Sequence, residues 1–240
     1  LLDQQLGKLR KSLRDLGIAD NTLVWYCSDN GGLVKETSGG RDKKGSIYEG
    51  GLRVPAILEW PAKYSPSAID TPACATDIYP TLLKIAGAKV AHQPRLDGID
   101  LADIIAGQQT QRPAMGFWHH HTTGQGTYSD RLIKQLMEAQ QAGQPNPLPE
   151  RILKNVEQFP KFTRGDYNGH AAWTDWPWKF HRIQKNGAVT TELYHLVNDP
   201  MEATDISGKE KARARQMQQA LEQWQSSVYD SWEGKDYARH

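Results

Sequence analysis

The chain has 240 residues, of which 38% are hydrophobic and 24% are charged, which is an ordinary composition for a globular protein of one large domain or one and a half. Its 29 Lys and Arg residues balance 28 acidic residues, and this net charge of +1 argues against a nucleic-acid partner, which would need a basic excess. Apolar stretches stay well short of the roughly 18 residues of a membrane-spanning helix.

The first elements follow from apolar spacing. A stripe at steps of four and three predicts an amphipathic helix that covers one face of a sheet and ends at Gly17, and it consists of Leu2, Leu6, Leu9, Leu13 and Leu16. Residues 23–27 then form an apolar run bounded by turn residues, which predicts a strand buried on both faces. Cys27 would serve there as a small apolar side chain. A second strand is expected over residues 54–58.

Two oxygen donors follow the first expected strand. It ends in Ser28-Asp29-Asn30-Gly31-Gly32, and in open α/β sheets ligands gather where strands end. Asp29 and Asn30 offer a carboxylate and an amide oxygen, which hard divalent cations prefer. Gly31 and Gly32 permit close approach to the backbone. Taken alone, this sequence is also a common turn.

Lys44 lies in a charged stretch beside Gly45 and could bring a compact positive charge to an anionic ester. A solvated surface side chain is the alternative interpretation. Ser46 and Glu49 have capping-box spacing, so we expect one helical turn at most before the next two glycines break it. Glu49 and Arg53 are expected to be structural, as a cap and a buried or half-buried ion pair.

A helix is predicted from about residue 77 to Gly87. Beyond the polar run at residues 107–111 we expect a strand at 115–118, a short helix opening at Ser129 and a linker at 140–149. Residues 150–174 show no clear periodicity.

The last third of the chain predicts a small antiparallel sheet and a helix. Residues 178–184 and 190–197 alternate and flank Asn186-Gly187, a strong hairpin signal. A capping box is expected at residues 207–210. A helical stripe then predicts a final helix that covers the sheet, formed by Met217, Leu221, Trp224 and Val228.

Several motifs, taken in order and spacing, closely resemble the sulfatase family. They are SDNGG at 28–32, KGSIYEGGLRVP at 44–55, EWP at 59–61, TDIYPTLLKIAG at 76–87, LDGIDL at 96–101 and ELYHLVNDP at 192–200. The resemblance covers roughly residues 1–105 and 175–230. It implies the α/β fold of the alkaline-phosphatase-like superfamily, a mixed sheet flanked by helices, with a small C-terminal subdomain of an antiparallel sheet and a helix. Residues 1–111 would be the C-terminal part of the catalytic α/β domain, and residues 112–240 the smaller subdomain.

The resemblance also implies an activity and a site. The reaction would be hydrolysis of a sulfate ester to an alcohol and sulfate, on a sulfated small molecule or carbohydrate. Asp29 and Asn30 would be two ligands of one divalent cation, Ca²⁺ in preference to Mg²⁺, and Lys44 would bind the sulfate and act in catalysis. His119, the first of three consecutive histidines, could line the substrate pocket, with a surface or packing role as the alternative.

One departure from the family bears on completeness. Sulfatases carry C/S-x-P/A-x-R, whose Cys or Ser becomes formylglycine, and neither Cys27 nor Cys74 begins that motif. We therefore expect the C-terminal portion of a longer sulfatase, inactive by itself, with the nucleophile and further metal ligands in a partnering N-terminal part. A periplasmic, extracellular or lysosomal location is implied by resemblance only. The alternatives are a phosphodiester or phosphonate hydrolase of the same superfamily, and a truncated, non-catalytic sulfatase.

Overall fold

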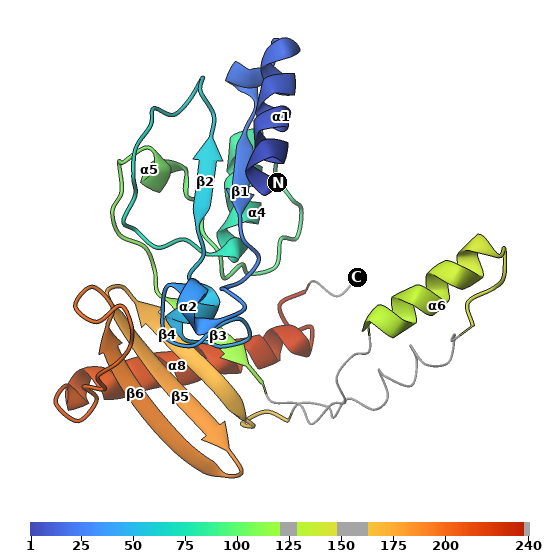
Figure 1. Ribbon diagram of the computed structural model, residues 1–240. Coiled ribbons are helices and arrows are strands. Elements are labelled where there is room, and N and C mark those ends of the chain that lie inside the picture. Colours follow the sequence, from blue (N-terminus) through green and yellow to red (C-terminus); the bar gives the residue numbers. More distant parts are fainter. Residues whose placement is uncertain (121–128, 148–162, 238–240) are drawn as a thin grey trace.

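The structure, a computed structural model, describes residues 1–120, 129–147 and 163–237. Its N-terminal part contains a short two-stranded sheet with helices, and its C-terminal part contains a four-stranded sheet crossed by a long helix (Figure 1). The fold is thus a mixture of helices and antiparallel sheets. The division at residues 111 and 112 stays a prediction, while the first strand of the larger sheet begins at Met115.

The N-terminal part follows the predicted order of elements. Helix α1 spans Leu2–Asp15, strand β1 Val24–Cys27 and strand β2 Ala56–Glu59. The two strands pair antiparallel, with Val24 opposite Glu59 and Cys27 opposite Ala56. The remaining short elements are η1 (Ala19–Asn21), α2 (Lys35–Ser38), α3 (Glu49–Leu52), η2 (Ala75–Asp77) and α5 (Ala102–Ile105).

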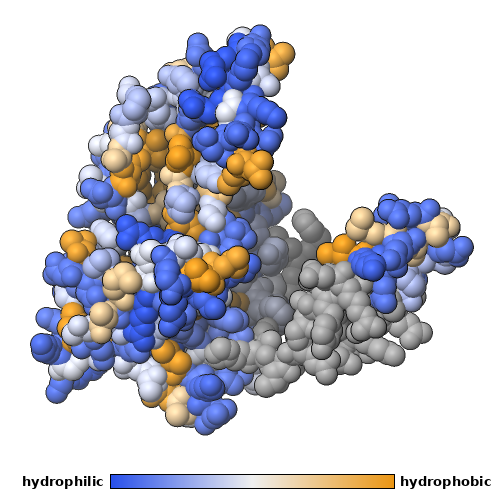
Figure 2. Space-filling view, in the orientation of Figure 1, coloured by the Kyte–Doolittle hydropathy of each residue, from blue (hydrophilic) through white to orange (hydrophobic). Residues whose placement is uncertain are grey.

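The prediction that β1 is buried on both faces is wrong. Cys27 is exposed, and the rest of β1 is only half-buried. Leu2 at the start of α1 and Leu16 just after its end are 66% and 70% exposed, and Ile57 in β2 is 60% exposed. The physical reason is that, among the described residues, β1 and β2 pair only with each other, so their apolar side chains meet few neighbours. Figure 2 shows hydrophobic residues on the surface of this part of the molecule.

The helix predicted from about residue 77 is confirmed as α4 (Ile78–Ala86), with Gly87 in the left-handed conformation at its end. Asp77 is fully buried just before it and accepts hydrogen bonds from the backbone N–H groups of Cys74 (2.7 Å) and Ile99 (2.8 Å). The Arg112 guanidinium pairs with the same carboxylate at 2.6 Å. One buried carboxylate therefore ties the two ends of the segment that follows β2.

The larger sheet consists of β3 (Met115–His119), β4 (Gly169–Asp175), β5 (Trp178–Lys185) and β6 (Ala188–His195), antiparallel and in that order. The predicted hairpin is confirmed. Lys185 lies opposite Ala188, and Asn186 and Gly187 between them have φ values of 52° and 78°, as a two-residue hairpin turn requires. Strand β4 lies in the stretch for which the sequence predicted nothing.

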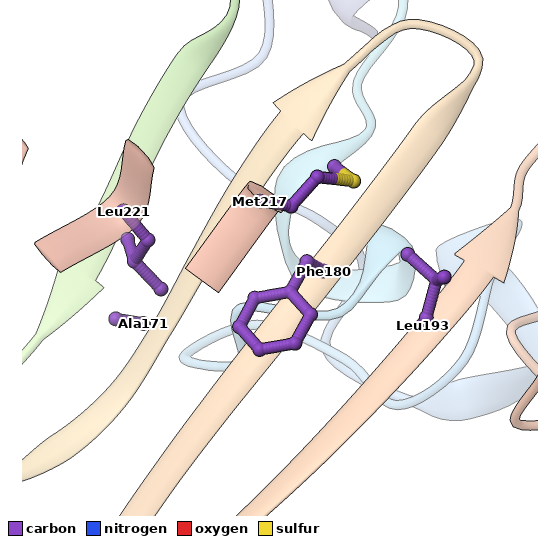
Figure 3. Close-up of a cluster of buried hydrophobic side chains, with 5 residues drawn as sticks. All are labelled: Ala171, Phe180, Leu193, Met217 and Leu221. Atoms are coloured by element: carbon purple, nitrogen blue, oxygen red, sulfur yellow. The ribbon is translucent and has the colours of Figure 1, made fainter. Parts of the chain in front are cut away.

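Helix α8 (Lys211–Trp232) covers one face of this sheet, as its apolar stripe predicts. Figure 3 shows the resulting core, in which two helical side chains meet three from the strands: Met217, Leu221, Ala171, Phe180 and Leu193. The capping box predicted at residues 207–210 is wrong. The N-cap is Glu210, not Ser207, and it makes no side-chain capping bond. The Ser207 hydroxyl instead donates to Asp205 at 2.9 Å.

Helix α6 (Ser129–Gln141) begins where predicted. The linker expected at 140–149 and the aperiodic stretch at 150–174 lie partly outside the described residues. Among the described helices, none combines the length and the apolar character needed to cross a membrane.

Candidate functional site

The turn after β1 is held by backbone hydrogen bonds. The backbone N–H of Ser28 donates to the carbonyl of Pro55 at 3.3 Å, and that of Gly31 donates to the carbonyl of Gly51 at 3.0 Å. The Ser28 hydroxyl closes the turn by donating to the carbonyl of Asn30 at 2.9 Å. The segment before β2 therefore fixes the backbone of the two predicted oxygen donors.

The side chains of those donors differ in surroundings. Asp29 is exposed. The Oδ1 atom of Asn30 is buried and has no hydrogen-bond partner within the part of the chain that the structure describes. A buried polar atom without a partner costs free energy, so it calls for an explanation such as a bound ion. An amide oxygen in this state suits a hard cation.

Lys44 joins the same turn through its backbone. Its N–H donates to the carbonyl of Gly32 at 2.9 Å, so the chain returns from α2 to the turn at this residue. The Lys44 side chain is exposed. The structure thus brings the backbone of Lys44 beside the turn that carries Asp29 and Asn30, although Gly32 and Lys44 are twelve positions apart in the sequence.

Backbone packs directly on backbone around this turn. A Cβ atom on Gly31 would lie 1.8 Å from the carbonyl oxygen of Gly50, one on Gly50 would lie 2.3 Å from that of Asp42, and one on Gly51 would lie 2.2 Å from that of Ser46. Any larger residue at these three positions would force the segments apart. The glycines are therefore needed for packing.

This packing corrects the prediction for residues 46–51. The expected length of one helical turn at most is confirmed by the four-residue α3, but Gly50 and Gly51 lie inside this turn instead of ending it. The Ser46 hydroxyl accepts a hydrogen bond from the backbone N–H of Tyr48 at 3.2 Å, so the predicted capping box is wrong. The structural role expected for Glu49 is confirmed, with Lys179 as its partner, whereas the Arg53 side chain is exposed.

A buried charge cluster lies beneath this segment, on the face of the larger sheet opposite α8. Lys179 and Glu202 are both 0% exposed. The Lys179 ammonium lies 2.7 Å from Oε1 of Glu49 and 3.1 Å from Oε1 of Glu202. The second carboxylate oxygen of Glu202 accepts the backbone N–H of Glu49 at 2.6 Å. Charge and hydrogen bonds thus join the segment to the sheet.

Two histidines extend the cluster. Burial lowers the pKa of His181 well below its usual value, and the charges of Lys179 and Arg41 lower it further, so this ring is neutral. Its Nε2 lies 2.7 Å from the Glu202 carboxylate, which can only accept, so Nε2 carries the proton. Its Nδ1 then accepts from Nε2 of His170 at 2.8 Å. The order Glu202, His181, His170 therefore fixes one tautomer.

Arg41 anchors the rim of the cluster. Its Nη1 donates to the Tyr194 hydroxyl (2.8 Å), to the Glu202 carbonyl (3.0 Å) and to the Glu192 carboxylate (3.2 Å). Its guanidinium stacks on the Tyr48 ring at 3.9 Å. Burial, reinforced by a hydrogen bond to Glu192, raises the pKa of Tyr48, so its hydroxyl stays protonated and donates at neutral pH.

His119 is exposed at the end of β3, with its Cα opposite that of His170. Its substrate-pocket role stays a prediction. His120 lies 3.4 Å from the Asp166 carboxylate, and His121 is outside the described residues. Among the described residues, no group of three or more His, Cys, Asp or Glu side chains could hold a metal ion. The role of Asp29 and Asn30 as cation ligands stays a prediction.

Comparison with known proteins finds sulfatases. Residues 1–88 match the family model described as Sulfatase. Over these residues the chain is a relative of the sulfatases. It is 37% identical over 135 residues to a sulfatase of Formosa agariphila, a match that covers 50% of this chain and 24% of that protein. It is 38% identical over 112 residues to arylsulfatase A of Homo sapiens, with 44% and 22% covered, and 34% identical over 132 residues to steryl-sulfatase of Mus musculus, with 50% and 21% covered. The matches to these sulfatases thus span less than a quarter of their length.

Solved structures extend the likeness to most of the chain. The crystal structure of Ps i-CgsB has a TM-score of 0.64 at 26% identity, with 92% of this chain and 40% of that chain covered. A protein from Bacteroides thetaiotaomicron, solved in a study of glycosaminoglycan metabolism, has a TM-score of 0.63 at 20% identity, with 92% and 42% covered. These likenesses show that the chain has the expected α/β fold of sulfatases.

Proposed function

We propose that this chain forms part of an enzyme that hydrolyses sulfate esters, in which the turn at residues 28–32 and Lys44 contribute to the reaction site. The observation that carries the proposal is the buried Oδ1 of Asn30, which has no hydrogen-bond partner among the described residues and lies in the turn joined to Lys44 by the Lys44–Gly32 backbone hydrogen bond. The amide oxygen of Asn30 suits a cation, and the side-chain ammonium of Lys44 suits an anion. Because the backbones of the two segments are neighbours, the two ions could be bound side by side.

Each residue has a distinct role in this proposal. Asp29 and Asn30 would hold a divalent cation, Ca²⁺ in preference to Mg²⁺, since both offer oxygen ligands. When bound, the cation would polarise the sulfate group. Lys44 would bind a sulfate oxygen and stabilise the negative charge that grows on the leaving oxygen as the S–O bond breaks. Water then supplies the atoms that yield one alcohol and one hydrogen sulfate ion.

Two further parts complete the proposed site. The nucleophile would be a formylglycine outside the residues of this chain. The exposed apolar side chains of β2 and beside α1 support a second idea, namely that the remaining sulfatase α/β sheet covers them as a partner, because exposed apolar surface and unpaired strand edges favour association.

A sulfated carbohydrate is the proposed substrate class. One structural neighbour at 20% identity, with a TM-score of 0.62, was solved with its substrate D-glucosamine-2-N,6-O-disulfate, and Ps i-CgsB was solved with k-i-k-neocarrahexaose. A sulfated small molecule is the second choice, since steryl-sulfatase and arylsulfatase A are among the relatives by sequence.

The test compares two esters of one phenol. The full-length protein that contains this sequence is given an aryl sulfate and the matching aryl phosphate, and free sulfate and phosphate are measured together with bound cations. We expect sulfate release with one bound cation per protein. Faster phosphate release with two bound cations would instead favour the phosphodiester or phosphonate hydrolase.

A further inference from the structure

We infer that Glu202 is a positioning residue for the segment that carries Lys44, an inference that rests on the proposed function of Lys44. Glu202 is fully buried and is the one side chain among the described residues that bonds at once to Lys179, His181 and the backbone of Glu49. It lies far from Lys44 in the sequence, in the turn after β6. Its effect on the site would pass through residues 41–51.

The backbone of Glu202 is unusual. Its φ is +49°, in the left-handed region that residues other than glycine rarely adopt and that persists only when the surroundings hold it. In this conformation the backbone carbonyl and the side-chain carboxylate of Glu202 both face residues 41–49. The carbonyl accepts Nη1 of Arg41 at 3.0 Å, while the side chain accepts the N–H of Glu49 at 2.6 Å. Glu202 thus forms hydrogen bonds to residues 41 and 49, the two ends of the loop that contains Lys44.

Backbone hydrogen bonds close the loop between residues 41 and 49. The backbone N–H of Gly50 donates to the carbonyl of Arg41 at 2.8 Å, which joins the ends of the loop to each other. The N–H of Ser46 donates to the carbonyl of Lys43 at 3.0 Å and makes a tight turn at Lys44. With both ends fixed, Lys44 has little backbone freedom.

The path then continues to the proposed cation ligands. Glu202 accepts the first N–H of helix α3, that of Glu49. The carbonyl of Gly51 in the same helix accepts the N–H of Gly31, which follows Asn30. The missing side chains at Gly31 and Gly50 bring the two backbones into direct contact. A shift of α3 would therefore move the Asn30 turn and the Lys44 loop together.

The charged carboxylate of Glu202 is needed to accept all of these hydrogen bonds. Both carboxylate oxygens face N–H donors: Oε1 faces His181 and Lys179, and Oε2 faces the backbone of Glu49. Glutamine has one carbonyl oxygen and one NH₂ group. In either orientation of the amide in Glu202→Gln, its NH₂ group faces a donor instead of accepting from it. The variant therefore loses the hydrogen bonds of one carboxylate oxygen while keeping the size of the side chain.

The test measures hydrogen–deuterium exchange along the full-length protein for wild type, Glu202→Gln and Glu222→Gln. Glu222 is a half-exposed glutamate on α8 and receives the same chemical change as a control. We expect amides of residues 28–53 to exchange roughly tenfold faster or more in Glu202→Gln, as the loss of a hydrogen bond to a charged group implies. Amides of β4, β6 and α8 should speed up by a clearly smaller factor, and the whole control should keep wild-type exchange.

A milder variant keeps the test decisive if Glu202→Gln fails to fold. Glu192→Gln weakens the bonds from Arg41 and Tyr48 at the half-buried rim and should speed exchange over the same residues by a smaller factor. Unchanged exchange at residues 28–53 in the folded variant, or a gain spread evenly through β4, β6 and α8, would overturn the inference.

Kinetics provides a second readout. In Glu202→Gln, kcat for an aryl sulfate should fall by about 10²-fold, as expected when a reacting group is misplaced by a distant change. A folded variant with faster exchange at residues 28–53 and wild-type kcat would also overturn the positioning role. If wild type releases no sulfate, the proposed function fails, while the exchange experiment still decides whether Glu202 holds the loop.

Discussion

Glu202 accepts the backbone N–H of Glu49 at 2.6 Å, a contact between residues 153 positions apart that joins the two parts of the fold. Beside it, Lys179 places its ammonium between the carboxylates of the same two residues. Charges this deeply buried are stable only as a set, because each ion without its partner loses its solvation and gains nothing in return.

Removing Lys179 should therefore destabilise the protein strongly. We expect Lys179→Met to lower the free energy of unfolding by about 3–5 kcal/mol, since it leaves the buried Glu202 carboxylate without its cation. Urea unfolding of the full-length protein, followed by tryptophan fluorescence, measures this, because Trp173 and Trp178 pack against the core of this sheet.

The matched control is Lys185→Met, the same change at the exposed end of β5, which should cost less than about 0.5 kcal/mol. The double variant Lys179→Met with Glu202→Gln should lose clearly less than the sum of the two single losses. Additive losses would show that the two side chains are not coupled.

Stability should fall in mild acid because of His181. Burial lowers the pKa of His181 well below 6.5, with help from the Lys179 and Arg41 charges. Below pH 6.5 the unfolded chain binds a proton on this residue that the folded protein does not bind. The free energy of unfolding then decreases by up to about 1.4 kcal/mol per pH unit, until the pH reaches the lowered pKa of the folded state.

Urea unfolding of the full-length protein at several pH values between 7 and 5 tests this contribution. His181→Gln should flatten the dependence in that range, while the same change at the exposed His92 should leave it as in wild type. An equal slope in wild type and His181→Gln would contradict a neutral, buried His181.

Asn30 should affect cation binding more than stability. Its Oδ1 has no protein donor among the described residues, so Asn30→Ala removes an oxygen ligand without breaking a hydrogen bond of that atom. We expect the full-length variant to retain less Ca²⁺ after dialysis, as elemental analysis would measure. Asn198→Ala, in the turn after β6, is the control and should retain the wild-type amount. Equal retention by both variants would remove Asn30 from the proposed ligand set.

Local sequence predicted the elements with strong periodicity and missed those defined by tertiary contacts. The Asn186-Gly187 hairpin and the stripe on α8 depend on local spacing, and both are confirmed. Strand β4 was missed because Ala171 and Ala172 are buried on opposite faces of a central strand, so apolar and polar residues do not alternate there.

The same limit applies to the site. Asp29, Asn30 and Lys44 stand out in motifs, whereas Glu202 follows Pro200-Met201 in an ordinary turn. Lys179 and His181 alternate with Phe180, a pattern typical of a solvent-facing side of a strand. Only the packing of residues 41–49 on that side makes them buried, and nothing local in the sequence indicates that packing.

The apolar surface beside β1 and β2 predicts poor behaviour of the isolated 240-residue polypeptide. Ile57 and Leu2 are mostly exposed, so we expect the isolated chain to bind a hydrophobic dye, to self-associate in sedimentation experiments and to release no sulfate. A monomeric species with a single cooperative melting transition and no dye binding would count against a covering partner for this surface.

The central claim concerns Lys44, and the most direct measurement is sulfate release from an aryl sulfate by full-length Lys44→Ala beside Lys43→Ala. Both lysines are exposed neighbours, so the two variants differ little in their expected effect on folding. We predict that Lys44→Ala lowers kcat by about 10² to 10³-fold with unchanged thermal unfolding, while Lys43→Ala keeps wild-type turnover. Wild-type turnover in folded Lys44→Ala would contradict the account.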